Sequence, residues 1–365
     1  MTKIEEKALK ILNILHDHSH ESYIVGGYVR DKLLNRESND VDICTSATPK
    51  EIMEIFPNTS SPNYGSINIS YKNSNFDITT FRKEIKYQDN RLPVKIKYIK
   101  SIKKDLLRRD FTINTFCMNK YGEVKDYLNA TPDLNERIIR TVGNPRYRLK
   151  EDSLRILRAI RFATILDFDI EPKTKHYLTE YAGLLKKLSN QRKKQELDKI
   201  FTSHRKTKGI NLLLELELDK ALKLNNLKNI TPCDDLIGIW AQLNVDDIYP
   251  FTKVEKQQMK KIRELLSLDI HDPYNLYNYD LYISTVVYQI KKESISNLNK
   301  LYQELPINSS KEIALNGKDI ALILNKKPGE YLKEITKDLE KQILSNKINN
   351  NKEELTQYIL ENFKN

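Results

Sequence analysis

A pair of glycines followed by two aspartates that are one residue apart suggests chemistry on a phosphate. Gly26 and Gly27 come directly after an apolar run, and Asp40 and Asp42 follow in the segment Asp40 to Cys44. We predict a strand for this segment, and alternation along it puts both carboxylates on one face. Two like charges so close repel each other unless a cation lies between them, and oxygen ligands favour Mg²⁺. The pattern therefore predicts a Mg²⁺ site that also binds phosphate.

The glycine pair itself predicts a sharp turn between two elements. Tyr23 to Val25 is expected to be a strand and Tyr28 to Leu34 a helix, so free backbone N–H groups gather just after the glycines. Such a helix start binds phosphate, and Arg30 in the first turn can reach the same phosphates. The simpler alternative is a glycine turn near solvated aspartates on an edge strand. The two motifs together favour a site for a nucleotide and a metal.

Two further segments carry groups that suit a nucleotide. Asp77 lies in an alternating strand, where it is either a third metal ligand or an ordinary edge-strand aspartate. Arg109 and Asp110 lie in the short stretch 104–114. Arginine suits a triphosphate by bidentate donation, and a carboxylate suits ribose hydroxyls. The alternative for this stretch is a charged helix end with a polar cap.

An arginine-rich segment predicts a device that reads a base. Glu151 to Ala163 is expected to be one helix with arginines on one side and apolar residues opposite. Asp152 and Arg155 form either a surface ion pair or a template. A carboxylate only accepts and a guanidinium only donates, so together they complement the pairing edges of cytosine and adenine. Guanine or uracil would leave buried polar groups unpaired. The other arginines on this side are Arg158 and Arg161.

The composition indicates a polyanionic partner and a reducing compartment. The 365 residues include 61 Lys and Arg against 50 Asp and Glu, a formal net charge of +11. Nucleic acid is the first candidate partner, although a lysine-rich proteome would give the same excess. Three scattered cysteines without a CxxC pattern argue against a disulfide framework or a zinc site. Without a signal-like or membrane-spanning apolar run, we expect a cytoplasmic protein with no membrane partner.

The order of elements predicts an α+β fold. Residues 1–145 mix helices and strands that are joined mostly by hairpins, which indicates a mainly antiparallel sheet. From about residue 147 onward, amphipathic helical segments replace the strands. The expected fold is therefore an N-terminal head with a sheet, followed by helices only.

These segments, in this order, resemble the class II tRNA nucleotidyltransferases. This family comprises the CCA-adding enzymes and their poly(A) polymerase relatives in the polymerase-beta superfamily. The resemblance implies a polymerase-beta-like head, a neck, a body and a tail, which we expect at 1–145, 146–205, 206–285 and 286–365. It spans roughly residues 20–200 and rests on the motifs GGYVRDKLLNR, NDVDICT, ITTFR, DLLRRDFTIN and EDSLRILRAIRFA.

The resemblance also implies roles for single residues. Asp40 and Asp42 are expected to be catalytic and to hold two Mg²⁺ ions. The residues expected to bind the incoming nucleotide are Gly27, Arg30 and Arg109 at the phosphates, Asp110 near the ribose, Asp152 and Arg155 at the base, and Arg158 and Arg161 as support.

The predicted activity is the addition of C, C and A to the 3′ end of tRNA from CTP and ATP. Members of the family that add only CC lack a flexible loop before the Arg-Arg-Asp motif. Here Lys83 to Lys104 fills that place at full length, including Tyr87, Asp89, Arg91 and Pro93. The alternatives are an A-adding enzyme or poly(A) polymerase on the same scaffold, and a catalytically silent RNA-binding relative. The sequence leaves open whether the chain forms a homodimer.

Overall fold

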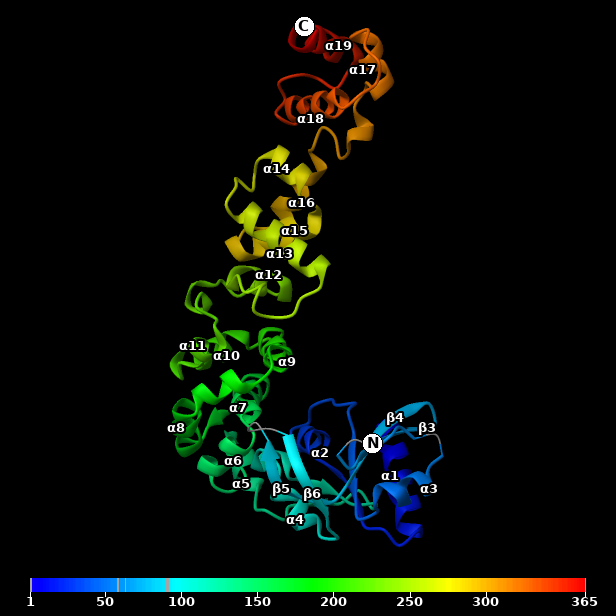
Figure 1. Cartoon of the computed structure of the whole chain (residues 1–365), viewed down its shortest axis with the longest axis vertical. Helices are drawn as coiled ribbons and strands as arrows, with labels where there is room; N and C mark the ends of the chain where they lie inside the picture. Colours follow the sequence, from blue (N-terminus) through cyan, green and yellow to red (C-terminus); the bar gives the residue numbers. More distant parts are fainter. Residues whose placement is uncertain (1, 58, 63, 89–91, 365) are drawn as a thin grey trace. The chain divides into compact units, whose positions relative to one another are not determined.

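The computed structural model describes residues 2–57, 59–62, 64–88 and 92–364, and it divides into two compact units. The first unit, Met1–Asn225, begins with the strands and continues with helices, and the second, Asn226–Asn365, is helical (Figure 1). This layout confirms the predicted α+β fold. The division into head, neck, body and tail is finer than these two units and stays a prediction.

A six-stranded sheet forms the centre of the N-terminal region, in the order β3-β4-β2-β1-β7-β8. All neighbours are antiparallel except β2 and β4, which are parallel and place Asp42 beside Asp77 in register. The mainly antiparallel sheet is thus confirmed. Its strands are β1 Ser22–Val25, β2 Asp42–Thr45, β3 Ser66–Tyr71, β4 Ser74–Thr80, β7 Cys117–Met118 and β8 Val124–Lys125.

Short helices cover and connect these strands. The first helix is amphipathic, packs against β1, and buries Ala8, Ile11, Leu12 and Leu15 completely. Thr48 and Glu51 form a capping box that starts α3, and Pro49 stands at the first helical position, where its fixed φ favours a helix start. The helices of this region are α1 Lys3–Asp17, α2 Gly27–Leu33, α3 Pro49–Ile55, α4 Ile102–Leu106 and α5 Thr131–Asn135.

The stretch predicted as a flexible loop is a β-hairpin in this structure. β5 Arg82–Gln88 pairs antiparallel with β6 Leu92–Tyr98 as a separate two-stranded sheet. Apolar and charged residues alternate along Val94 to Tyr98, which favours a strand. Asp89 and Arg91, which the sequence analysis singled out, lie outside the described residues, as do the side chains of Tyr87 and Pro93.

Helices follow the sheet through the rest of the first unit, and one prediction there is wrong. The expected single helix from Glu151 to Ala163 is broken at Asp152, whose backbone is extended (φ −139°, ψ 101°). Its Oδ1 atom accepts a hydrogen bond from the N–H of Leu154 (3.0 Å), because a short carboxylate competes with helical bonding and caps the next helix. The helices are α6 Pro145–Glu151, α7 Leu154–Leu166, α8 Pro172–Glu180, α9 Asn190–Phe201, α10 Lys206–Glu215 and α11 Leu218–Leu222. A two-stranded parallel sheet joins β9 Ile138–Ile139 to β10 Asp169–Ile170.

The second unit is built from helices around its own core. Trp240 is fully buried and contacts the rings of Tyr249 and Phe251. The helices are α12 Leu236–Leu243, α13 Lys253–Leu266, α14 Pro273–Asn278, α15 Leu281–Lys291, α16 Ile295–Gln303, α17 Gly317–Ile323, α18 Tyr331–Leu344 and α19 Lys352–Phe363. Across the part of the chain that the structure describes, none of the helices has the length and apolar character needed to cross a membrane.

Candidate active site

The glycine turn has the predicted form, and Gly26 is the residue that requires it. This glycine follows β1 with φ +81° and ψ −130°, a conformation that residues with a side chain rarely adopt. A Cβ atom there would also lie 3.4 Å from Nη1 of Arg109. Gly27 begins α2 in an ordinary helical conformation. The turn therefore places Arg109 directly against the glycine motif, although the two are far apart in the sequence.

The two predicted catalytic aspartates lie at and just before the start of β2. The strand begins at Asp42, so the expectation that Asp40 lies within it is wrong. The reason is the glycine turn, since Val25 of β1 pairs with Asp42 and the chain turns away at Gly26, leaving Asp40 without a strand to pair with. Both aspartates are exposed, as a metal site requires.

The surroundings of Asp42 disfavour its negative charge. Asp42 keeps solvent-accessible surface, but the protein around it and the charge of Asp40 raise its pKa to about 6. The positive charges of Arg109 and Arg158 act in the opposite direction and lower this pKa. A bound divalent cation would relieve the repulsion, and the pair of carboxylates fits Mg²⁺, which commonly takes one or two carboxylates together with substrate phosphate.

Asp77 lies beside the pair, but the structure gives it a different partner. Its Oδ1 atom accepts a hydrogen bond from Nδ2 of Asn68 (3.0 Å). Among the described residues, no three or more His, Cys, Asp or Glu side chains form a group that could hold a metal ion. Asp77 thus lies in register with Asp42 and has Asn68 as a hydrogen-bond partner, and both the two-carboxylate site and a third ligand stay predictions.

Arg109 is the cation best placed to meet a phosphate at this site. Its side chain is 18% exposed, and its ion pair with Asp105 is long (3.5 Å). Asp105 is fully buried and binds more closely to Nε of Arg108 (2.8 Å) and the N–H of Arg82 (3.0 Å). Within the described part of the chain, Nε of Arg109 has no hydrogen-bond partner. Arg109 thus retains donors that a bound nucleotide could use.

Asp110, which is buried, and Arg158, whose side chain is 31% exposed, form an ion pair that connects the sheet region to α7. Oδ2 of Asp110 accepts from Nε of Arg158 (2.7 Å), and Oδ1 accepts from the N–H of Phe111 (2.8 Å) and Nδ2 of Asn114 (3.1 Å). Burial alone would raise the pKa of Asp110, but the charge of Arg158 and these hydrogen bonds hold it well below its usual range. Here Asp110 positions neighbouring groups, and contact with a ribose stays a prediction.

Arg30 is buried and committed to protein partners. It donates to both oxygens of Asp31 (2.8 and 2.9 Å) and to Oδ1 of Asn114 (2.6 Å). Asn114 thus contacts both Arg30 and Asp110, so it joins two of the predicted motifs. A phosphate contact by Arg30 would require it to exchange one of these partners.

Phe162 is a residue of this region that the sequence analysis missed. Its ring lies 5.2 Å from the guanidinium carbon of Arg30, 5.3 Å from that of Arg158 and 4.4 Å from that of Arg161. Cation–π contacts hold a planar guanidinium in a fixed orientation. The available signal was an aromatic residue directly after three regularly spaced arginines, and at about 100° per residue it falls on the same side of the helix as they do.

The predicted base-reading residues lie at the junction of α6 and α7. Arg155 is buried and donates to the carbonyls of Arg148 (2.9 Å) and Arg108 (2.9 Å). Its ion pair is with Glu151 (3.5 Å). The structure therefore brings Arg155 to the segment that carries Arg109, while the expected helical pairing with Asp152 is replaced by the break in the helix.

Arg161, the last of the predicted nucleotide-binding residues, points to α9. It is buried and pairs with Glu196 (3.2 Å). The structure thus places Arg109 against the turn at Gly26, whose neighbour Val25 pairs with Asp42, and it joins Arg158 to Asp110. Arg155 and Arg161 hold α7 in place against its neighbours.

Models of known protein families match three parts of this chain. A model described as "Poly A polymerase head domain" matches residues 22–140, which include the glycine turn and the aspartates. A model of tRNA nucleotidyltransferase domain 2 matches residues 251–359. A third, described as "Probable RNA and SrmB-binding site of polymerase A", matches residues 167–223.

Relatives cover the whole chain. A CCA-adding enzyme of Anoxybacillus flavithermus is 34% identical over 98% of this chain and 97% of its own length. The crystal structure of the Bacillus stearothermophilus CCA-adding enzyme in complex with CTP matches with a TM-score of 0.84 and 27% identity, over 99% of this chain and 98% of that one. The Thermotoga maritima CCA-adding enzyme complexed with tRNA has the same fold (TM-score 0.73, 22% identity, 99% and 96% covered). The chain therefore belongs to the CCA-adding enzymes, a family of nucleotidyltransferases that act in tRNA processing.

Proposed function

We propose that this chain adds C, C and A to the 3′ end of tRNA, using CTP and ATP and releasing pyrophosphate. The observation that carries the proposal is the juxtaposition of exposed Asp40 and Asp42 with Arg109 and the Gly26 turn. The tRNA and CTP named for solved relatives support the same substrates here.

Asp40 and Asp42 are the residues that would hold two Mg²⁺ ions. When bound, the ions supply Lewis-acid stabilisation of the attacking 3′-hydroxyl and of the leaving pyrophosphate. Arg109 then contributes fixed positive charge beside the phosphates, where donors are most effective. The hydrogen bond to Asp110 holds the guanidinium of Arg158 in place, and this group would supply a second positive charge that acts on Asp42.

Base selection is proposed for Asp152 and Arg155. Asp152 is half-buried and Arg155 is buried, so a mismatched base would leave desolvated groups unpaired. For Arg155 to read a base, its guanidinium must exchange a carbonyl partner, that of Arg108 or Arg148, for the base edge. Because Arg108 precedes Arg109, this exchange would couple base reading to the segment beside the phosphates.

Removal of either catalytic carboxylate tests the mechanism. We expect Asp40→Ala and Asp42→Ala to reduce incorporation of labelled CTP into tRNA lacking CCA to background. Asp17→Ala, at an exposed acidic residue on α1, is the matched control and keeps full activity. Incorporation at the control rate by either site variant would refute the metal assignment.

The base template has its own test. We expect Asp152→Ala to let UTP or GTP compete with CTP, measured as nucleotide identity in the tRNA product by mass spectrometry. Unchanged selectivity in this variant, with Asp17→Ala as reference, would remove Asp152 from base reading.

A poly(A) polymerase is the second candidate, favoured by the description of the family model that matches the head. Such an enzyme would extend an RNA with many AMP residues and ignore CTP. The mass of one tRNA after incubation with CTP and ATP separates the candidates, since we expect it to gain two C nucleotides and one A nucleotide. Metal-dependent turnover in the same assay excludes a catalytically silent relative.

Two predictions about the cellular context remain proposals. The three cysteines, Cys44, Cys117 and Cys233, are free and buried, as expected for a cytoplasmic protein with reduced thiols. Whether the chain forms a homodimer is left to a measurement of its mass in solution.

A further inference from the structure

A basic pocket lies in the first unit, apart from the catalytic carboxylates. Its volume is about 510 Å³. It is lined by Arg36 from the loop after α2, by one residue of α7, and by the end of α9 with the turn that follows, which supplies Lys199, His204 and Arg205. Two segments that are distant in the sequence therefore place cations around one cavity, and α7 adds Ile165.

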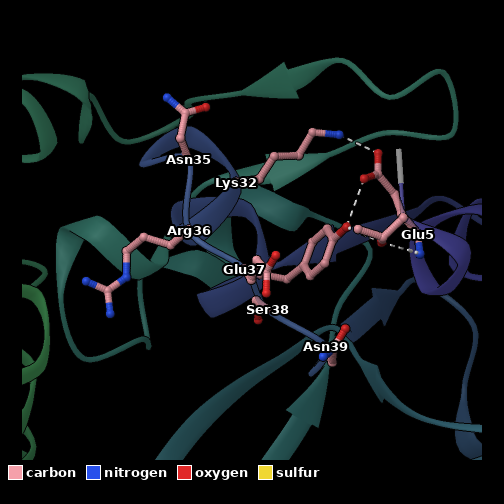
Figure 2. A pocket seen from close by; sticks show the side chains of 9 residues that line it. Glu5, Lys32, Asn35, Arg36, Glu37, Ser38 and Asn39 are labelled. Carbon is pink, nitrogen blue, oxygen red and sulfur yellow. Dashed lines mark hydrogen bonds and ion pairs between the residues drawn. The ribbon is translucent and has the colours of Figure 1, made fainter. Parts of the chain in front are cut away.

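Arg36 also lines a second pocket, and the residues there show the direction of its side chain. That pocket, of about 500 Å³, is lined by Glu5, Lys32 and the loop from Asn35 to Asn39. Lys32 pairs with the buried Glu5, and Figure 2 shows the Arg36 side chain directed away from both. The charges of Glu5 and Lys32 thus offset each other, and Arg36, which also lines this pocket, directs its side chain away from that pair.

The charges that line the basic pocket are unbalanced. The residues around it include two arginines, one lysine and one histidine, and no carboxylate. Arg205 pairs with Asp167 outside the lining (3.0 Å). Arg36 and Lys199 are exposed, and among the described residues neither makes an ion pair. A concave site with uncompensated cations concentrates anions, and a phosphate group matches the fork of Arg36 and the point charge of Lys199.

Phosphate at this position could come from the RNA backbone or from free pyrophosphate, and the position favours RNA. Arg36 is four residues before Asp40, so at about 3.5 Å per residue their Cα atoms lie within about 14 Å. A phosphate close to a 3′ end that reacts at Asp40 is therefore within reach of this neighbourhood. The α9–α10 part of the pocket also lies inside the stretch 167–223 that matches an RNA-binding family model.

We propose that this Arg36 pocket binds a backbone phosphate of the RNA substrate close to its 3′ end. The inference rests on the proposed function for the identity of the RNA. Arg36 and Lys199 supply the binding charge, and the catalytic carboxylates are not part of the pocket. The pocket would fix the position of the RNA without contacting the reacting atoms.

Direct binding tests the proposal independently of catalysis. The probe is labelled tRNA lacking CCA, and binding is followed by fluorescence anisotropy in the inactive Asp42→Ala background from 50 to 300 mM KCl. We expect Arg36→Gln and Lys199→Gln each to weaken binding about threefold to tenfold near 150 mM salt and to lower the slope of log Kd against log salt by about 1. Lys199→Arg keeps the affinity, and Lys10→Gln, at an exposed lysine of α1, is the charge-matched control.

A second arm separates the two sources of phosphate. In the active protein we expect Arg36→Gln and Lys199→Gln to raise the KM for tRNA and to leave the KM for CTP and inhibition by added pyrophosphate unchanged. Weaker pyrophosphate inhibition with unaltered tRNA binding would assign the pocket to free pyrophosphate and overturn the proposal. Affinities equal to that of the Lys10→Gln control would overturn it as well. If catalysis were of another kind, the anisotropy measurement would still report on RNA binding.

Discussion

The charge of Asp42, a predicted metal ligand, lowers the stability of the folded protein. Its carboxylate lies near Asp40 and Asp77, and its pKa of about 6 exceeds the ordinary value of 3.8. Between these two pH values the folded state binds more protons than the unfolded state. Stability therefore falls as the pH rises through this window, and the full penalty is present at neutral pH.

Replacement of this carboxylate should stabilise the metal-free protein. We expect Asp42→Asn to raise the free energy of unfolding at pH 7 in EDTA by less than about 1 kcal/mol, because solvent screens this exposed group. The gain should disappear at pH 4, and added Mg²⁺ should stabilise the wild type but not the variant. Urea denaturation measures all three, and a destabilised variant at pH 7 would contradict the argument.

Asp110 is the opposite case, a carboxylate whose charge stabilises the fold. Its pKa is held below its usual range, so its contribution is complete above the unfolded value of 3.8 and is lost as the pH falls below it. We expect Asp110→Asn to lower the free energy of unfolding by about 1–3 kcal/mol at pH 7, since it leaves the partly buried Arg158 without its counter-ion. The difference from wild type should shrink as urea denaturation is repeated at lower pH. A difference that grows in acid would exclude the ion pair as its source.

At the scale of elements, the glycine turn sets the positions of both catalytic motifs. It ends β1, starts α2, and fixes where β2 can begin, because Val25 is the last residue of β1 and pairs with Asp42. The same turn provides the surface against which Arg109 packs. A single backbone conformation thus relates the carboxylates to the arginine.

Substitution of the two glycines should separate the effect of the turn on stability from an effect on nucleotide binding. We expect Gly26→Ala to lower the free energy of unfolding by about 1–3 kcal/mol, owing to its positive φ and the close approach of Arg109. Gly27→Ala is the matched control for folding, because its added Cβ would lie 3.7 Å from the nearest side-chain atom, Nη2 of Arg30, in ordinary contact. If Gly27 approaches the triphosphate as predicted, this variant should instead raise the KM for CTP. Equal losses of stability in both variants would show that Gly26 has no special role.

At the scale of the whole molecule, the excess of positive charge has a measurable consequence. With a formal net charge of +11, binding of tRNA should release counter-ions and weaken steeply with salt. We expect the KM for tRNA to rise at least about tenfold between 50 and 200 mM KCl, and the KM for CTP to change much less. Parallel steady-state kinetics with each substrate varied in turn would check this, and similar salt dependence for both would argue against extended backbone contacts.

The sequence by itself determined what kind of fold this chain has, and it predicted which residues carry the chemistry. Local patterns were sufficient for this, because alternation, helical period, the glycine pair and the Pro49 helix start depend on neighbouring residues only. The same patterns gave the mainly antiparallel sheet and the helical remainder, and the ordered motifs gave the family.

Only the tertiary structure decided how those residues meet. The sequence could not show that Asp40 precedes its strand, that α6 and α7 are separate, or that residues 82–98 form a hairpin, because each depends on partners distant in the sequence. The contacts of Phe162 with three arginines, the Asp110–Arg158 pair and the Arg36 pocket have the same origin. Packing between residues that are distant in the sequence sets the direction of buried arginine side chains. The residues responsible are distributed over the whole first unit, so no single motif predicts these contacts.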